Sequence, residues 1–215
     1  MKRLMLTLCC AAVAALPIVA QQKDDPDKNV AGAGTLPSGW QARLDNPGAN
    51  LSSLKFVAAG GGFHATTGPA AIFFKPATVE HGPFQASATF TQTKPAAHPE
   101  AYGIIIGGAD LSGPAQKYTY FLVRQDGKFL IKRRDGDQTK NVKEWTENAA
   151  IKKADDTGKT TNTLTVDAGK TDVRFLVNDA EVASLPASGI DTQGIVGLRV
   201  NHNLDVEIIG FSVKH

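Results

Sequence analysis

The chain alternates apolar and polar positions over many short stretches from residue 70 to its end. A period of two residues is typical of strands that bury one face, whereas an amphipathic helix repeats about every 3.6 residues. Gly, Pro, Asn and Asp interrupt the alternation at short intervals, as expected for turns between strands. The stretches predicted as strands are 70–77, 84–90, 101–108, 118–125, 128–134, 162–169, 173–185, 194–201 and 204–213.

The succession of these stretches predicts the architecture. Short strands without intervening helices favour an antiparallel sandwich or jelly roll over a parallel α/β sheet, because parallel strands need long crossover connections. We therefore predict an all-β protein, a two-sheet antiparallel β-sandwich, in one domain spanning residues 39–215. Residues 144–156, EWTENAAIKKADD, are predicted to form a short helical turn or a long surface loop.

Residues 121–136, FLVRQDGKFLIKRRDG, predict one hairpin in detail. An Asp-Gly pair between two alternating stretches is a strong signal for a tight turn. If residues 126 and 127 alone form the turn, Tyr120 pairs with Arg133, and Arg124 lies with them on an exposed face. The side chains then expected to point into the core are those of Phe121, Val123 and Leu130.

The exposed face of this hairpin carries chemistry suited to sugars. An aromatic ring such as Tyr120 stacks on the face of a pyranose, and the guanidinium groups of Arg124 and Arg133 donate hydrogen bonds to hydroxyls or to a carboxylate. A second interpretation stays open, because cations on a strand also keep it soluble and cover apolar surface with their aliphatic stems.

Two further residues are candidates for the rim of a binding face. Trp145 stands in the polar context KEWTEN, where it could stack on a sugar or anchor its own loop. His202 lies in the Asn-His-Asn sequence between the last two predicted strands, where it could act as a donor or simply belong to a tight turn.

The N-terminus is typical of an exported protein. Lys2 and Arg3 precede an apolar stretch that ends near Ala20, which predicts a signal peptide over residues 1–20. Residues 21–38 are polar and then rich in Gly and Ala, and are predicted to be a flexible linker. We expect a secreted or periplasmic protein without a transmembrane segment in the mature chain, and one without cysteine, because both cysteines lie in the leader.

The net charge and the absence of known motifs argue against binding of nucleic acid and of transition metals. Loss of the leader removes two cations and lowers the formal net charge from +2 to zero, which argues against a nucleic-acid partner. The histidines are scattered and no zinc-binding spacing occurs, so we expect no metal site. Residues 135–141, DGDQTKN, offer oxygen ligands that could hold calcium, but turn chemistry also accounts for them.

Three segments of the chain resemble a known superfamily. They are YTYFLVRQDGKFLIKRRDG, VRFLVNDAEVASLP and GIVGLRVNHNLDVEIIGFSV, at 118–136, 173–186 and 194–213. They resemble the closing half of concanavalin A-like lectin/glucanase domains, especially laminin-G-like and keto-disaccharide hydrolase-like domains. Residues 39–76 are similar to the opening half. The resemblance implies a concanavalin A-like jelly roll with a carbohydrate site on its concave sheet face.

The resemblance does not imply a reaction. The Glu-x-Asp-x-x-Glu sequence expected of a retaining β-glucanase of this fold does not occur. We therefore predict a non-catalytic carbohydrate-binding module, with a glycan or cell-surface partner and with Tyr120, Arg124, Arg133, Trp145 and His202 as ligand-binding residues. A glycoside or keto-disaccharide hydrolase on the same fold, and a structural envelope or adhesion protein without a small ligand, are the alternatives.

Overall fold

The computed structural model describes residues 26–32, 35–46 and 48–215. The predicted signal peptide and the first part of the predicted linker lie outside these residues, so both stay predictions. Within the part of the chain that the structure describes, no helix is long and apolar enough to cross a membrane.

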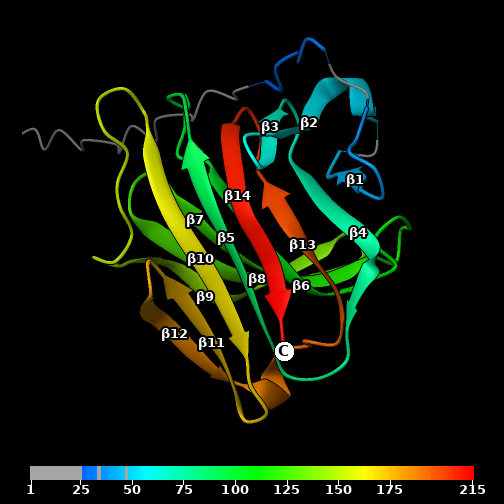
Figure 1. Cartoon of the computed structure of the whole chain (residues 1–215), viewed down its shortest axis with the longest axis vertical. Coiled ribbons are helices and arrows are strands. Elements are labelled where there is room, and N and C mark those ends of the chain that lie inside the picture. The colour runs from blue at the N-terminus through cyan, green and yellow to red at the C-terminus, as the bar shows by residue number, and fades with distance from the viewer. Residues whose placement is uncertain (1–25, 33–34, 47) are drawn as a thin grey trace, which may run out of the picture.

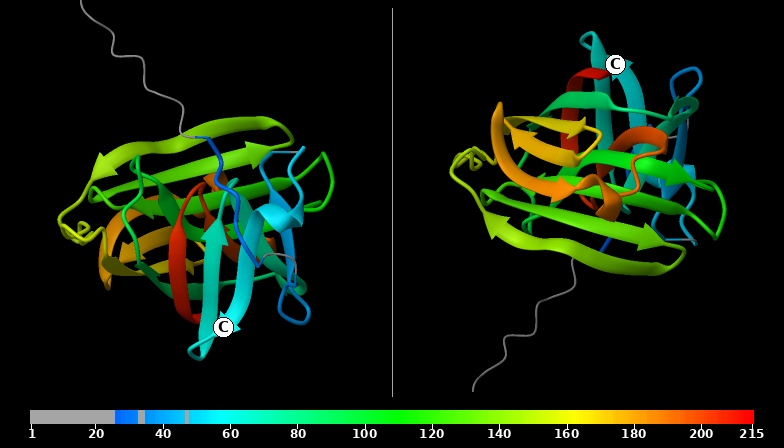
Figure 2. Two further views of the ribbon diagram at one scale, coloured as in Figure 1. Left: turned by 90° about the horizontal axis from the view of Figure 1, so that it is seen from above. Right: turned by 90° about the horizontal axis from the view of Figure 1, so that it is seen from below.

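The described chain forms fourteen strands in two antiparallel sheets of seven, which confirms the predicted all-β sandwich (Figure 1). Sheet A has the strand order β1-β4-β13-β6-β7-β8-β9, and sheet B has the order β12-β11-β10-β5-β14-β3-β2. Figure 2 shows the two sheets as separate layers, with the green strands of sheet A on one side and red β14 with cyan β2 and β3 on the other. Sheet A consists of β1 (Gln41–Leu44), β4 (Ala71–Glu80), β13 (Gly194–Val200), β6 (Ala101–Ala109), β7 (Lys117–Arg124), β8 (Lys128–Asp135) and β9 (Gln138–Glu147). Sheet B consists of β12 (Ala180–Pro186), β11 (Asp172–Val177), β10 (Thr160–Ala168), β5 (Phe84–Gln92), β14 (Asp205–Lys214), β3 (Gly62–Thr67) and β2 (Leu54–Ala59).

The main core lies between the two sheets, where the apolar side of each alternating strand is buried. Phe56 of β2 stacks on Phe73 of β4 with their ring centroids 4.3 Å apart, so this pair joins sheet B to sheet A. The polar side of the sheet B strands faces outward, whereas β6 and β7 of sheet A are buried on both sides. On sheet B, for example, Thr89 of β5 and Thr163 of β10 hydrogen-bond across the strands at 2.8 Å. In sheet B the period of two therefore assigns each side chain to the core or to the outside.

The β7–β8 hairpin forms where it was predicted, but its register differs by one residue. The turn has three residues, and Gly127 closes it with a positive φ of 83° and a hydrogen bond from its N–H to the carbonyl of Arg124. A three-residue turn of this kind needs a left-handed residue, which glycine supplies at little cost. Tyr120 consequently pairs with Lys132, not with Arg133. Leu130, predicted to lie in the main core, lies on the other face of sheet A.

Strand β9 takes up the first four residues of the segment 144–156, and the rest of that segment forms the surface loop that was one of the two predictions. The strand continues to Glu147, and an irregular loop of residues 148–159 follows. Trp145 is therefore part of a strand at the edge of sheet A. Its position is set by pairing of β9 with β8, which places the indole beside the outer face of the sheet.

The outer face of sheet A is concave. Arg134 on β8 approaches the carboxylate of Asp45, which directly follows β1, to 3.4 Å. These strands are five positions apart in the sheet order, which would separate them by roughly 24 Å if the sheet were flat. Side-chain contact over that span requires the sheet to curl around this face and the chain after β1 to turn over it. We call this surface the concave face of sheet A.

Candidate functional site

A cluster of charged and aromatic side chains fills the middle of the concave face. Arg199 of β13 donates from Nη1 and Nη2 to the two carboxylate oxygens of Asp45, at 3.0 and 2.5 Å. Its guanidinium carbon lies 4.9 Å from the ring centroid of Tyr120, and Nη1 donates to the hydroxyl of Tyr118 at 3.3 Å. Arg199 is only 5% exposed. The cluster therefore combines a desolvated ion pair with aromatic packing.

The charges in this cluster are coupled. Burial alone would raise the pKa of Asp45, but Arg199 and, more weakly, Arg134 and Arg43 outweigh it and hold that pKa below its usual value. Burial raises the pKa of Tyr120 to about 12, although Arg199 opposes the rise. At neutral pH the face thus presents an ionised Asp45 and a neutral Tyr120 hydroxyl.

The edge of the concave face is formed by Trp145 and Arg124. The guanidinium carbon of Arg124 lies 4.4 Å from the Trp145 ring centroid, which is cation–π geometry. Asp126 in the β7–β8 turn accepts two hydrogen bonds from Arg124, both at 2.7 Å, and fixes the guanidinium in place. Trp145 remains partly exposed, so this pair forms a rigid aromatic and cationic edge next to the buried cluster.

The structure brings three of the five predicted site residues onto one face. Tyr120, Arg124 and Trp145 share the concave face of sheet A. Tyr120, however, is 4% exposed and covered by a guanidinium group, so its ring is not an open stacking surface as expected. Arg133 pairs with Thr119 and points to the opposite side of the strand, because the turn is one residue longer than predicted. His202 lies in the β13–β14 turn, with Nδ1 3.3 Å from a carboxylate oxygen of Glu100.

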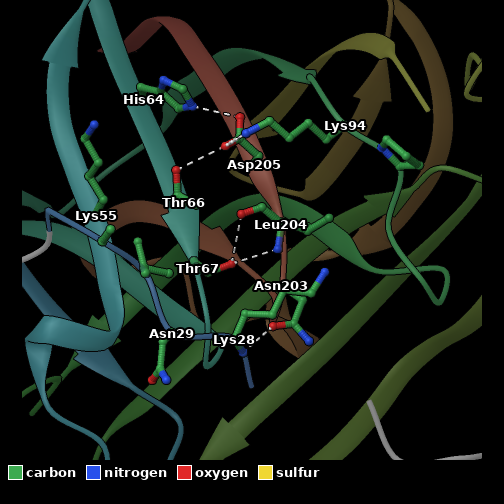
Figure 3. A pocket seen from close by; sticks show the side chains of 13 residues that line it. Lys28, Asn29, Lys55, His64, Thr66, Thr67, Lys94, Asn203, Leu204 and Asp205 are labelled. Carbon is green, nitrogen blue, oxygen red and sulfur yellow. Dashed lines mark hydrogen bonds and ion pairs between the residues drawn. The ribbon is translucent and has the colours of Figure 1, made fainter. Parts of the chain in front are cut away.

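A separate pocket of about 400 Å³ lies on the outside of sheet B (Figure 3). Strands β2, β3 and β14 form its floor, and residues 28–31 form one wall. Figure 3 shows His64, Thr66 and Lys94 around the carboxylate of Asp205, while Lys55 lies on the neighbouring strand. None of these residues was predicted as a site residue.

Asp205 is held by four donors in this pocket. The distances to its carboxylate oxygens are 2.8 Å from His64 Nε2, 3.2 Å from Thr66 Oγ1 and 3.0 Å from Lys94 Nζ. The Thr93 hydroxyl donates to the same carboxylate. Burial alone would raise the pKa of Asp205, but these donors lower it to about 2. Such an acid stays ionised at neutral pH and is unsuited to donate a proton as a general acid.

The low pKa of Asp205 predicts a pH dependence of folding. A carboxyl whose pKa falls from 3.8 to about 2 on folding adds stability that is fully present above pH 4 and is lost as the pH drops through 2. The contribution is on the order of 2 kcal/mol at pH 7. We expect the difference in unfolding free energy between wild type and Asp205→Asn to shrink from pH 6 to pH 2 in urea titrations. A constant difference over this range would contradict the role of the donors.

In the part of the chain that the structure describes, no three His, Cys, Asp or Glu side chains come together in a way that could hold a metal ion. In the stretch considered for calcium, Asp135 is 3.4 Å from the ammonium group of Lys117.

Comparison with known proteins establishes the fold. No protein-family model matches the chain, and no curated protein matches its sequence. A carbohydrate-binding module, CBM66, from Bacillus subtilis superposes with a TM-score of 0.62 at 12% identity, over 82% of this chain and 96% of that one. A protein of unknown function with a galectin-like fold, also from Bacillus subtilis, superposes with a TM-score of 0.54 at 11% identity, over 81% and 88% of the two chains. The chain therefore has a concanavalin A-like jelly-roll fold, a two-sheet sandwich that it shares with these two structures.

Proposed function

We propose that the protein is an exported, non-catalytic carbohydrate-binding module that holds a glycan on the concave face of sheet A. The observation that carries this proposal is the arrangement on that face of Trp145 and Arg124 beside the Arg199–Asp45 cluster. A partly exposed indole provides an apolar surface for a sugar ring, and fixed guanidinium groups donate to its hydroxyls. The shared fold with a carbohydrate-binding module supports the proposal by analogy.

The two aspartates considered on this face are both paired with arginines, which argues against glycoside hydrolysis. A pair of carboxyl groups, one of them protonated, is required for the usual acid/base mechanism. Asp45 is paired with Arg199 and kept ionised, and Asp126 is engaged with Arg124 at the end of the face. These contacts favour binding over cleavage.

The proposal is tested with a glycan array and an assay for released sugar. We expect binding without sugar release. We expect Trp145→Ala to raise the dissociation constant about tenfold, because the stacking surface is lost. Ile209→Ala is the matched control, since Ile209 is an exposed apolar residue on sheet B.

Each other outcome contradicts the proposal in a distinct way. Release of sugar would move the protein to the hydrolase class. An equal effect of the two alanine variants would show that the glycan does not bind on the concave face. Absence of binding to any glycan would favour the structural role, in which the buried cluster only closes this side of the sandwich.

A further inference from the structure

Positive charge is concentrated on the concave face beyond what its acidic group neutralises. Three guanidinium groups, those of Arg43, Arg134 and Arg199, all act on the single carboxylate of Asp45 and lower its pKa. Arg43 lies on β1 two residues before Asp45 and Arg199 lies on β13, whereas Arg134 comes from the distant strand β8 and reaches the cluster through the curl of the sheet. Counting these four groups, the cluster carries two positive charges in excess.

Two of these guanidinium groups have unused donors. The Nε atoms of Arg43 and Arg134 are buried and, among the described residues, have no hydrogen-bond partner. The Arg134 side chain is only 13% exposed, so water solvates it poorly. Buried donors of a charged group are costly to leave unpaired, and excess charge in a partly desolvated site attracts an anion. The cluster therefore favours the binding of a further acceptor.

The surroundings point to a planar anion on a sugar. A guanidinium fork matches the two oxygens of a carboxylate, and a bidentate pair is stronger than a hydrogen bond to a neutral hydroxyl. Lys132, directly opposite Tyr120 on the neighbouring strand, adds a further cation to the face. The Trp145 and Arg124 edge lies toward the other end of these strands, because Arg124 pairs with Lys128 and Tyr118 pairs with Arg134, and it supplies a stacking surface for another ring of the same glycan.

We propose that the concave face selects glycans that carry carboxylate groups, the uronic-acid class, and that Arg43 and Arg134 recognise the carboxylate. This inference rests on the proposed glycan-binding function and adds the class of sugar. Arg199 remains engaged with Asp45 and holds the face in its shape. The net charge of the whole protein plays little part, because the excess is local to this face.

The test uses two forms of one polymer. Polygalacturonate and its fully methyl-esterified form share a backbone and differ in charge at each sugar. Isothermal titration or affinity electrophoresis of the full-length protein is expected to show at least tenfold tighter binding of the acidic form, and that preference should decrease as salt is raised. Poly-glutamate serves as a polycarboxylate without sugar and is expected to bind at least tenfold more weakly than polygalacturonate.

Single substitutions test whether Arg43 and Arg134 bind the carboxylate. Arg43→Gln is expected to weaken binding of polygalacturonate about tenfold, and Arg134→Lys, which keeps the charge and loses the fork, to weaken it severalfold. Arg174→Gln on the outside of sheet B is the control for loss of one positive charge and should bind as wild type does. Thermal melting of each variant shows whether it is folded. If one of the two site variants fails to fold, the other still tests the proposal.

The possible failures are distinguishable. Equal binding of the acidic and esterified polymers would overturn the acid selectivity and leave glycan binding intact. Binding of poly-glutamate as tight as that of polygalacturonate, or binding unaffected by both site variants, would overturn the assignment of the carboxylate to this cluster. If neither these polymers nor any neutral glycan binds, the proposed function itself is wrong.

Discussion

Replacing Arg199 with leucine is expected to lower the free energy of unfolding by about 3 kcal/mol, because it breaks a desolvated ion pair. The variant loses two charge-assisted hydrogen bonds to Asp45, the contact with the Tyr118 hydroxyl and the packing on Tyr120. Arg43 and Arg134 still neutralise part of the Asp45 charge, which keeps the loss below the upper end for a buried pair. Urea denaturation at pH 7 measures the change.

The control for this prediction is Arg174→Leu. Arg174 is paired with acidic residues as well, namely Asp167 and Glu181, but its side chain is 48% exposed. Exposed ion pairs contribute about 0–1 kcal/mol, so the control should lose no more than that. Equal losses in the two variants would show that the concave-face cluster is no more than a surface ion pair. A double-mutant cycle with Asp45→Asn isolates the pairwise energy.

Replacing Asn162 with leucine is expected to cost about 4 kcal/mol, because several buried polar groups would lose their partners. Asn162 is fully buried in β10. Its Oδ1 accepts from the Lys152 N–H at 2.9 Å and from Asn178 Nδ2 at 2.8 Å, and its Nδ2 donates to the Lys152 carbonyl at 3.1 Å. This amide is therefore a central contact between the 148–159 loop and the sandwich.

Two measurements check the Asn162 prediction. Chemical denaturation gives the loss of stability, and limited proteolysis should show faster cleavage within residues 148–159 in the variant. Asn141→Leu is the control, because Asn141 is exposed on β9 and, among the described residues, its side chain hydrogen-bonds only to the Glu144 carboxylate. A variant at position 162 with unchanged proteolysis would mean that other contacts hold the loop.

Most strands with a buried face were predictable, but β2 and β3 each bury one and were not predicted. Alternation located β5, β10 and β13, because each presents apolar side chains to the core at every second residue. Strand β9 escaped prediction because it is an edge strand whose ten residues are mostly exposed, so that its sequence carries no apolar alternation. Strand β1 has only four residues, too few for a period to be recognised.

The candidate site was predictable only in part, for a related reason. Tyr120 and Arg124 lie four residues apart on one strand, so their common face follows from the period of two. Arg199 and Asp45 are 154 positions apart and meet only because the sheet curls. In the pocket of sheet B, His64 and Asp205 come from strands that pair over a similarly long separation. No local pattern indicates such partners.

The sequence by itself determined that this is a β protein and which stretches form most of its strands. It could do so because side chains alternate between the two faces of any strand, whatever that strand pairs with. The order of the strands, the one-residue shift of the β7–β8 turn and the curl of sheet A were decided only in the tertiary structure. These features depend on which strands pair and how the two sheets pack, and they gather the arginines around Asp45.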